Sequence, residues 1–413
     1  MNFYKLSSKY NLIYLIFSFL PISFVIGKAV LEFNIILIII IFLKDLIYEN
    51  HNLKSFFQSK IFVSLIILWI YLIFNILVGL NNFENTHRGL FFFKYILLVF
   101  AFIHYLKIDS LRDKIINFWT IVLLIVSFDV YYEFFIGKNI LGFVSPMKNE
   151  RIISFFKDEL IVGSYLATFL FIIFGKFYSN GKLILPLILF SIISFAIFLT
   201  GERSIVIKIF FSYLIIIFFV FKNPKLKIFT ILFLFFIILI ISANKNLNAR
   251  YTKGFTEIRN NMKNPSIYES ILNINYLNQL IFSYEILKRN YLFGVGTKNY
   301  FKACIDLKNT SENEHVKKNT HKCFVHPHQF YYEFVSEHGI IGTVLILICI
   351  FMLFSSKGTI QLNNQKKSQL FIFKIYIIIS LIPIIPSGTF FSSLNLFQFF
   401  LNYSFYQIYL SKK

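Results

Sequence analysis

Hydrophobic residues in this chain gather into long runs, and polar residues are confined to the stretches between them. Twelve of these runs approach the ~20 mostly apolar residues that a helix needs to cross a bilayer. They cover about 11–27, 29–43, 61–80, 89–106, 115–137, 160–175, 183–200, 204–221, 226–243, 333–354, 370–386 and 389–410. The pattern predicts an all-α polytopic membrane protein with about twelve transmembrane helices. The second run is short enough to be re-entrant, and the first two, which meet near Gly27, also fit one bent hairpin.

The longest polar interval is the only segment able to form a small domain outside the membrane. It divides the chain into helices 1 to 9 over 1–243, a loop domain over 244–332, and helices 10 to 12 over 333–413. The first run follows Lys5 and Lys9, as in a signal peptide, but it lacks a convincing small-residue cleavage site and another run follows at once. We therefore expect an uncleaved first helix.

The composition excludes the common soluble classes. The chain is 57% hydrophobic and 15% charged, whereas soluble domains are about 25% charged. Its 56 phenylalanines exclude intrinsic disorder, and three cysteines in 413 residues exclude a disulfide scaffold. The net charge of +21 would suggest a nucleic acid partner in a soluble protein. Here the charge lies between hydrophobic runs, so we expect membrane lipids as anionic partners and no nucleic acid.

The distribution of lysine and arginine predicts the orientation in the membrane. The even-numbered connections and the two termini hold 18 such residues, and the short odd-numbered connections hold seven. Because cytoplasmic loops carry the excess of positive charge, both termini are predicted to be cytoplasmic. The 244–332 loop then lies outside, and it is too long for its own charge to count.

Polar residues in a mostly apolar chain are costly and therefore informative, and here they gather in four stretches on the predicted outer side. The first covers 151–167, where a helix N-terminus alone would explain Asp158 and Glu159. The second is the tight turn 200–204. Its Arg203 either snorkels at a helix end or offers forked donors to a phosphate.

The other two outer stretches belong to the long loop. In the stretch 276–300, apolar residues at helical spacing predict an amphipathic helix along the membrane face. Gly294 and Gly296 then break it and indicate a tight turn or a close backbone approach. The fourth stretch, 326–339, holds three of the eight histidines at the mouth of the tenth run.

A zinc site is the obvious rival explanation for these histidines. However, His326 and His328 are two residues apart rather than four, and no cysteine pair has the spacing of zinc ligands. Cys304 and Cys323 lie 19 residues apart in the same outer loop, which suits a disulfide in an oxidising compartment. Cys349 lies inside a run and is expected to pack without reacting.

Other chemistries leave no trace in the sequence. There is no phosphate-binding or dinucleotide-binding glycine loop, no serine nucleophile elbow and no paired-carboxylate glycosidase site. A transporter would more often carry charges or broken helices at mid-membrane depth. The charges within runs are few, and none pairs obviously with another: Lys94, Asp129, Lys208 and Lys374.

The order of these motifs resembles the O-antigen ligase and O-antigen polymerase superfamily. That family has a large outer loop before its last three spans, with a Gly-x-Gly element followed by a histidine and, eleven residues later, a glycine. Here LFGVG carries Gly294 and Gly296, and His328 is followed by Gly339 in HPHQFYYEFVSEHGIIG. The segment KDELIVGSYLA and the turn TGERS, with Arg203, also resemble recurrent family segments.

The sequence departs from the family pattern at two positions. Gln329 stands where members often have asparagine, and Tyr276 stands where many carry an arginine. The missing arginine is replaced by Arg250, Arg259 or Arg289, and the sequence leaves that choice open. We take Arg289 as the working candidate.

The resemblance implies an all-helical fold of the GT-C type and a glycosyltransferase that needs neither metal nor cofactor. Members move a glycan from an undecaprenyl-diphosphate carrier to an acceptor at the periplasmic face of the bacterial inner membrane. By this resemblance Arg203 binds the diphosphate and Arg151 and Arg289 extend the anionic site. His328 positions groups and stabilises charge or acts as a base. The supporting residues are Glu337, which orients His328, and the glycines Gly294, Gly296 and Gly339.

The acceptor distinguishes the possible activities. A ligase uses lipid A–core, a polymerase uses another repeat-unit glycan, and a third group uses protein. The outer loop of about 90 residues after nine spans favours the ligase. From another functional class, a polysaccharide exporter or flippase would place its charges around a central cavity at mid-membrane depth. The meeting of Arg203, Arg151 and His328 at one outer cavity would favour transfer chemistry.

Overall fold

The computed structural model describes residues 3–48, 59–79, 86–147, 150–157, 159–178, 183–261, 275–354, 364–383 and 385–411, and in this part every regular element is helical. The helices before the long loop are α1 (Phe3–Ser18), α2 (Leu20–Ile26), α3 (Lys28–Tyr48), α5 (Lys60–Val78), α6 (Thr86–Phe91), α7 (Phe93–Leu106), α8 (Asp109–Ile136), α9 (Val162–Tyr178), α10 (Ile184–Leu199), α11 (Arg203–Ile215) and α12 (Pro224–Ala243). After it come α18 (Phe330–Phe354), α19 (Asn364–Ser380) and α20 (Ser393–Leu410).

Seven helical segments in the described part are long and apolar enough to cross a membrane. They are Lys9–Ile26, Lys60–Val78, Gly89–Leu106, Asp109–Ile136, Arg203–Val220, Pro224–Ala243 and Phe330–Phe354. The apolar helices α9 and α10 are shorter, with 17 and 16 residues. Charged residues interrupt α3, and polar ones interrupt α19 and α20. The all-helical membrane architecture is therefore as predicted, whereas the number of twelve spans stays a prediction.

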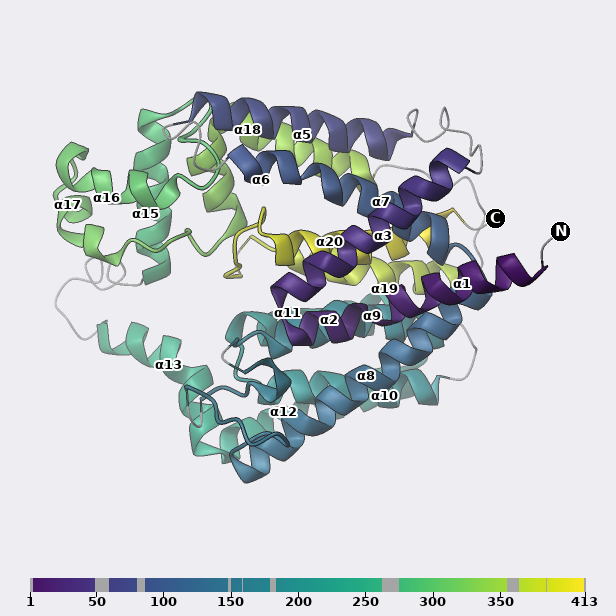
Figure 1. Ribbon diagram of the computed structural model, residues 1–413. Coiled ribbons are helices and arrows are strands. Elements are labelled where there is room, and N and C mark those ends of the chain that lie inside the picture. The colour runs from purple at the N-terminus through teal and green to yellow at the C-terminus, as the bar shows by residue number, and fades with distance from the viewer. Residues whose placement is uncertain are drawn as a thin grey trace.

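The bundle has two distinct ends. Most of its helices run side by side, and both chain termini lie at one end (Figure 1). The helices of the long loop lie at the other: α13 (Lys245–Asn261), α15 (Asn275–Arg289), α16 (Tyr300–Thr310) and α17 (Glu314–Asn319). Of these, α15 runs across the direction of the bundle helices (Figure 1). The loop helices and the chain termini therefore lie at opposite ends of the bundle, and the side of the membrane that each occupies stays a prediction.

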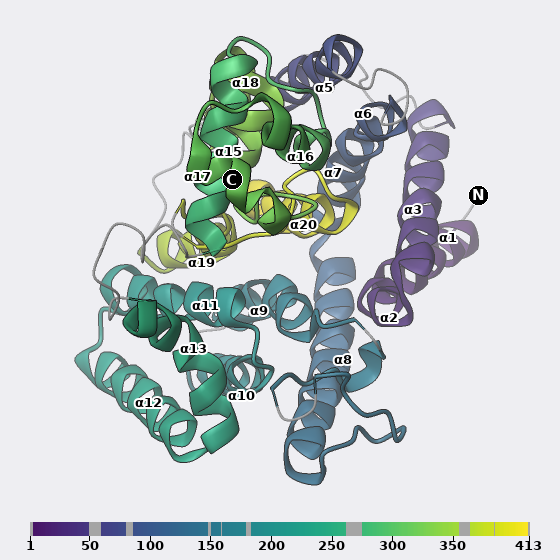
Figure 2. The same cartoon turned by 90° about the vertical axis from the view of Figure 1, so that its left-hand side faces the viewer.

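Helices α9 and α20 form the centre of the bundle, where nearly every side chain is buried. Helix α20 packs against α7, α9 and α19, and Figure 2 shows the bundle from the end that carries the loop helices. Polar residues of α20 hold the centre together, because the Asn402 amide donates to the Thr168 carbonyl at 2.9 Å. The Gln398 amide donates to the Ser164 hydroxyl at 3.0 Å. Buried amides of this kind persist only when they are hydrogen-bonded.

The loop helices α15 to α17 have a small hydrophobic core of their own. It contains Phe282, Ile286, Tyr300, Leu307 and Val316. A disulfide between Cys304 and Cys323, the pair singled out in the sequence, joins α16 to the segment that leads into α18. The loop therefore holds the histidine stretch against a packed body.

Helix α18 begins at Phe330, three residues earlier than expected, and is interrupted at Gly339, where the backbone is not helical (φ 63°, ψ −166°). The turn after α15 fills the interruption. Val295 N–H donates to the Ser336 carbonyl at 3.0 Å and Gly296 N–H to the Glu337 carbonyl at 2.9 Å. The Gly-x-Gly turn and the kinked helix therefore form one backbone-paired unit.

Candidate functional site

A cavity of about 710 Å³ lies where α9, α11 and the segment after α19 meet the histidine stretch. Its polar lining includes Ser164, Glu202, Ser204, Lys208, Lys298 and His326. All four outer stretches of the sequence contribute to this lining, although they span residues 151 to 339 of the chain. We call the side formed by residues 150–164 and 200–208, together with Arg250, the arginine wall, and the side formed by 293–298 and 326–339 the histidine wall.

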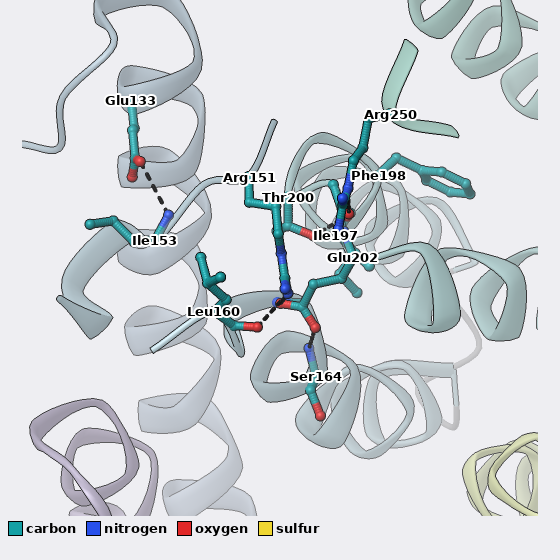
Figure 3. A network of polar contacts seen from close by, with 12 residues as sticks. Glu133, Arg151, Ile153, Leu160, Ser164, Ile197, Phe198, Thr200, Glu202 and Arg250 are labelled. Carbon is teal, nitrogen blue, oxygen red and sulfur yellow. Dashed lines mark hydrogen bonds and ion pairs between the residues drawn. The ribbon is translucent and has the colours of Figure 1, made fainter. Parts of the chain in front are cut away.

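The turn between α10 and α11 is built around Gly201 and Glu202. Gly201 has a φ of 71°, and a Cβ there would lie 2.1 Å from the Glu150 carbonyl oxygen, so only glycine fits. The buried Glu202 carboxylate accepts from the backbone N–H of Gly163 at 2.7 Å and of Ser164 at 3.3 Å (Figure 3). It therefore caps α9 and faces the cavity. Burial raises the pKa of Glu202 to about 7, which the nearby Arg151 opposes.

Arg151 points at the same carboxylate from the neighbouring loop (Figure 3). Its Nη2 lies 3.8 Å from Glu202 Oε1 and donates to the Leu160 carbonyl at 2.5 Å. Burial lowers the pKa of this guanidinium, and Arg203 and Arg250 lower it further, while Glu202 raises it. The side chain of Asp158, in the same stretch, lies outside the described residues.

The histidine wall places two imidazoles in contact. The ring centroids of His326 and His328 are 4.1 Å apart, and His326 lines the cavity. His328 has a φ of 56° and accepts from Ser387 N–H at 2.7 Å through its carbonyl. Burial lowers the pKa of both imidazoles, that of His326 to about 4, so both are uncharged at neutral pH.

Behind the imidazoles, a carboxylate of α18 fixes the Gly-x-Gly turn. Glu337 Oε2 accepts from Lys298 N–H at 2.7 Å, and Lys298 has a φ of 67°. The Lys298 ammonium lines the cavity and lies 3.9 Å from the buried Glu333 carboxylate. Sequence reasoning found Glu337 but not Lys298 or Glu333, and only the position of Lys298 two residues after Gly296 could have signalled it.

Residues 188–347, which include the turn 200–204, the Gly-x-Gly turn and the histidine stretch, match a protein-family model described as O-antigen ligase. This match supports the resemblance to the O-antigen ligase and O-antigen polymerase superfamily over those residues. No curated protein matches the chain. Arg151 and the whole of α9 lie before the matched residues, so their part in the site rests on the geometry alone.

The site residues predicted from the sequence differ in whether they line the cavity. Arg203, Arg151 and His328 are not among the residues that line it, but Glu202, Ser204 and His326 beside them are. Arg203 is the first residue of α11, and its guanidinium makes no hydrogen bond or ion pair with the described residues. The three predicted residues therefore do not themselves meet at the cavity, and their chain neighbours line it in their place.

Among the three arginines proposed to replace the superfamily arginine at Tyr276, the structure brings Arg250 to the arginine wall. Arg250 Nε donates to the Gly201 carbonyl at 3.1 Å, and Nη1 donates to Glu150 at 3.2 Å. Arg289, the working candidate, is exposed at the end of α15, donates to the Thr310 carbonyl and does not line the cavity. The side chains of Arg259 and Tyr276 lie outside the described residues.

Two carboxylates of α8 hold the loop that carries Arg151. Glu133 accepts from Ile153 N–H at 3.1 Å and from Ser154 N–H at 2.6 Å. Asp129, counted above as an unpaired charge, accepts from the Ser154 hydroxyl at 2.6 Å. Sequence reasoning missed these contacts, because they join residues 20 to 25 positions apart across an irregular loop. Within the described residues, no group of three or more His, Cys, Asp or Glu could hold a metal ion.

Proposed function

We propose that this protein transfers a glycan from an undecaprenyl-diphosphate carrier to lipid A–core at the periplasmic face of the inner membrane, as an O-antigen ligase. The observation that supports this best is the cavity into which the arginine and histidine walls both open. The match of residues 188–347 to the O-antigen ligase family model supports a glycosyltransferase of the ligase or polymerase type. In this proposal both termini are cytoplasmic, and the loop helices, at the opposite end of the bundle, are periplasmic.

The reaction is a substitution at the anomeric carbon of the donor sugar. The acceptor hydroxyl oxygen forms a bond to that carbon, and the bond from carbon to the phosphate oxygen breaks. The electron pair of the broken bond leaves with the lipid diphosphate, and the hydroxyl proton passes to a base or to water. The protein must therefore bind a diphosphate, stabilise its growing charge and orient a hydroxyl.

In this scheme the arginine wall binds the diphosphate. Arg203 suits the role because its guanidinium is not engaged by the described residues and its fork matches phosphate oxygens. Arg151 and Arg250 are already hydrogen-bonded to backbone carbonyls, at Leu160 and Gly201. They would raise the positive potential around the turn while the Glu202 carboxylate holds it in place.

The histidine wall orients the acceptor. An uncharged imidazole offers one N–H donor and one acceptor nitrogen, so His328 can position a hydroxyl and receive its proton. His326, in ring contact with His328, would form the surface that the substrate meets. Glu337 would keep this wall in register through Lys298 N–H.

The surface glycans of a strain that lacks this gene provide the test. On a gel stained for lipid A–core, loss of the whole ladder with accumulation of lipid-linked polymer would support the ligase. A core that carries a single repeat would instead indicate a polymerase of the same superfamily. An unchanged ladder would remove lipid A–core as the acceptor, and lipid-linked glycan trapped on the cytoplasmic face would favour a flippase.

A further inference from the structure

Four lysines line the cavity, and one of them differs from the others. Three have a carboxylate partner; the pairs are Lys28–Glu159 at 3.8 Å, Lys94–Glu32 at 2.5 Å and Lys298–Glu333 at 3.9 Å. Lys208 makes no hydrogen bond or ion pair with the described residues. Its ammonium lies over an aromatic ring, since Nζ is 5.9 Å from the ring centroid of Phe330.

A lysine that has no counter-ion among the described residues, inside a helix that can cross a membrane, needs an explanation. Lys208 belongs to the segment Arg203–Val220, one of the seven segments that can cross a membrane. Ionisable groups at such positions are rare because losing water is costly, and they usually pair with each other or mark a binding site. A contact with one aromatic face is a weak substitute for a counter-ion. We therefore expect the negative charge that pairs with Lys208 to belong to a molecule bound in the cavity.

The position of Lys208 on α11 directs its ammonium into that cavity and toward the outer face. Ser204 and Lys208 are four residues apart, so they share one face of the helix, and both line the cavity. Lys208 is about 7.5 Å along the helix axis from Arg203, but helical side chains tilt toward the N-terminus, which here is the outer end. Lys208 thus belongs to the arginine wall, and its ammonium lies over the ring of Phe330 on the histidine wall.

We propose that Lys208 is an anion-binding residue of the substrate cavity and pairs with a negatively charged oxygen of the bound donor. This inference rests on the proposed function and adds a point charge to the forked donor of Arg203. The oxygen belongs either to the diphosphate of the carrier or to an acidic sugar of the glycan. In both cases the chemistry is an ammonium bound to phosphate or carboxylate oxygen.

The test is a binding measurement that does not depend on transfer. Full-length wild type, Lys208→Met and Lys208→Arg are purified in nanodiscs and titrated with undecaprenyl diphosphate that carries no sugar, and separately with an acidic oligosaccharide. Methionine keeps the length of the apolar stem and removes the charge. The matched control is Lys374→Met, since Lys374 is another lysine within an apolar helix, contacts the rings of Phe354 and Tyr406, and does not line the cavity.

A charge-assisted hydrogen bond corresponds to a change in affinity of roughly ten- to a hundredfold. We expect such a loss in Lys208→Met, partial recovery in Lys208→Arg, and no change in Lys374→Met. Weaker binding of undecaprenyl diphosphate would identify the carrier as the source of the anion. Weaker binding of only the acidic oligosaccharide would identify the glycan.

Two other outcomes would overturn the inference, and they are distinguishable. If the wild type binds undecaprenyl diphosphate and Lys208→Met binds both probes equally well, Lys208 is not an anion-binding residue and the proposed function stands. If the wild type binds neither probe, the proposed function fails and the inference fails with it. Thermal stability is measured in parallel for each variant, so that loss of folding is recognised as such.

Discussion

The two walls of the cavity are fixed in place by different kinds of interaction. On the arginine wall, side-chain carboxylates hold backbone amides: Glu202 binds the start of α9, and Glu133 binds the loop that follows Arg151. On the histidine wall, backbone pairs with backbone, as Val295 and Gly296 do with the kinked helix. The first wall is held by groups that titrate, and the second mainly by shape.

The shape of the histidine wall depends on close approaches that leave no room for side chains. A Cβ on Gly294 would lie 2.4 Å from the Glu337 carbonyl carbon, and one on Gly339 would lie 2.5 Å from the Leu292 carbonyl. The buried Asn75 of α5 completes the unit, since its amide donates to the carbonyls of Phe293 at 2.8 Å and Glu337 at 3.2 Å. This comparison indicates that steric changes should damage the histidine wall most and charge changes the arginine wall most.

The largest effect is expected from an added methyl group on the histidine wall. Gly294→Ala and Gly339→Ala each place a Cβ against backbone at a positive φ (68° and 63°). The conformational strain alone costs about 1–2 kcal/mol, and the overlap adds to it because backbone cannot yield. Glycan transfer should be abolished, and thermal unfolding of the purified protein should occur at lower temperature.

Gly142→Ala provides the control for this comparison. Gly142 also has a positive φ, of 86°, but no atom lies within 4 Å of the position of its Cβ. It should therefore show the strain without the overlap, with a smaller loss of stability and with transfer retained. Equal damage at Gly142 and Gly339 would mean that close packing of the turn against α18 is unimportant.

On the arginine wall, the largest effect is expected from loss of the Arg203 guanidinium. Arg203→Ala should lower the rate of transfer by roughly 10²- to 10³-fold, as for other residues that stabilise charge in the transition state. Arg203→Lys should also be severely impaired, because an ammonium does not reproduce the fork. The rate is measured with reconstituted protein and lipid-linked donor. His328→Ala should be similarly inactive, and full activity in either alanine variant would remove that residue from the mechanism.

The sequence predicted the helical fold better than the construction of the candidate site. The hydrophobic runs mark helices because the bilayer sets their length, and Arg203 and the glycines stand out among apolar neighbours. The contacts that hold these residues in place could not be predicted from the sequence. Asn75 is 218 residues away from Phe293 and 262 from Glu337, and nothing in its own neighbourhood indicates the contact. Glu202 adjoins Arg203 in the turn, yet its role as a cap for α9 depends on a fold that spacing along one chain does not specify.

Arg250 and Arg289 are two candidates for the missing superfamily arginine, and they lie in different parts of the molecule. Arg250 contacts the turn at Gly201, whereas Arg289 is bound to the Thr310 carbonyl on the loop helices. We expect Arg250→Ala to reduce transfer by about tenfold, equivalent to roughly 1.4 kcal/mol, and Arg289→Ala to change it little. The two variants form a matched pair measured in one assay. A reversed order would restore Arg289 as the replacement for the superfamily arginine.

The smallest effect is expected from pH, to which the two walls should respond in opposite directions. Burial raises the pKa of Glu202 from 4.5 to about 7, so the folded state retains its proton longer and stability falls as pH rises through this range. Burial lowers the pKa of His326 from 6.5 to about 4, so the unfolded state binds the proton first and stability falls as pH drops from about 6.5 to 4.

Thermal unfolding between pH 4 and 7.5 separates the two contributions. Glu202→Gln should remove the decline toward pH 7 that the wild type shows, and His326→Phe should remove the decline toward pH 4. Glu314→Gln is the control, since the Glu314 side chain is 72% exposed and lies outside both walls. If the stability of Glu202→Gln followed that of the wild type at every pH, burial of the carboxylate would cost no net free energy of folding. The hydrogen bonds from Gly163 and Ser164 would then offset its desolvation completely.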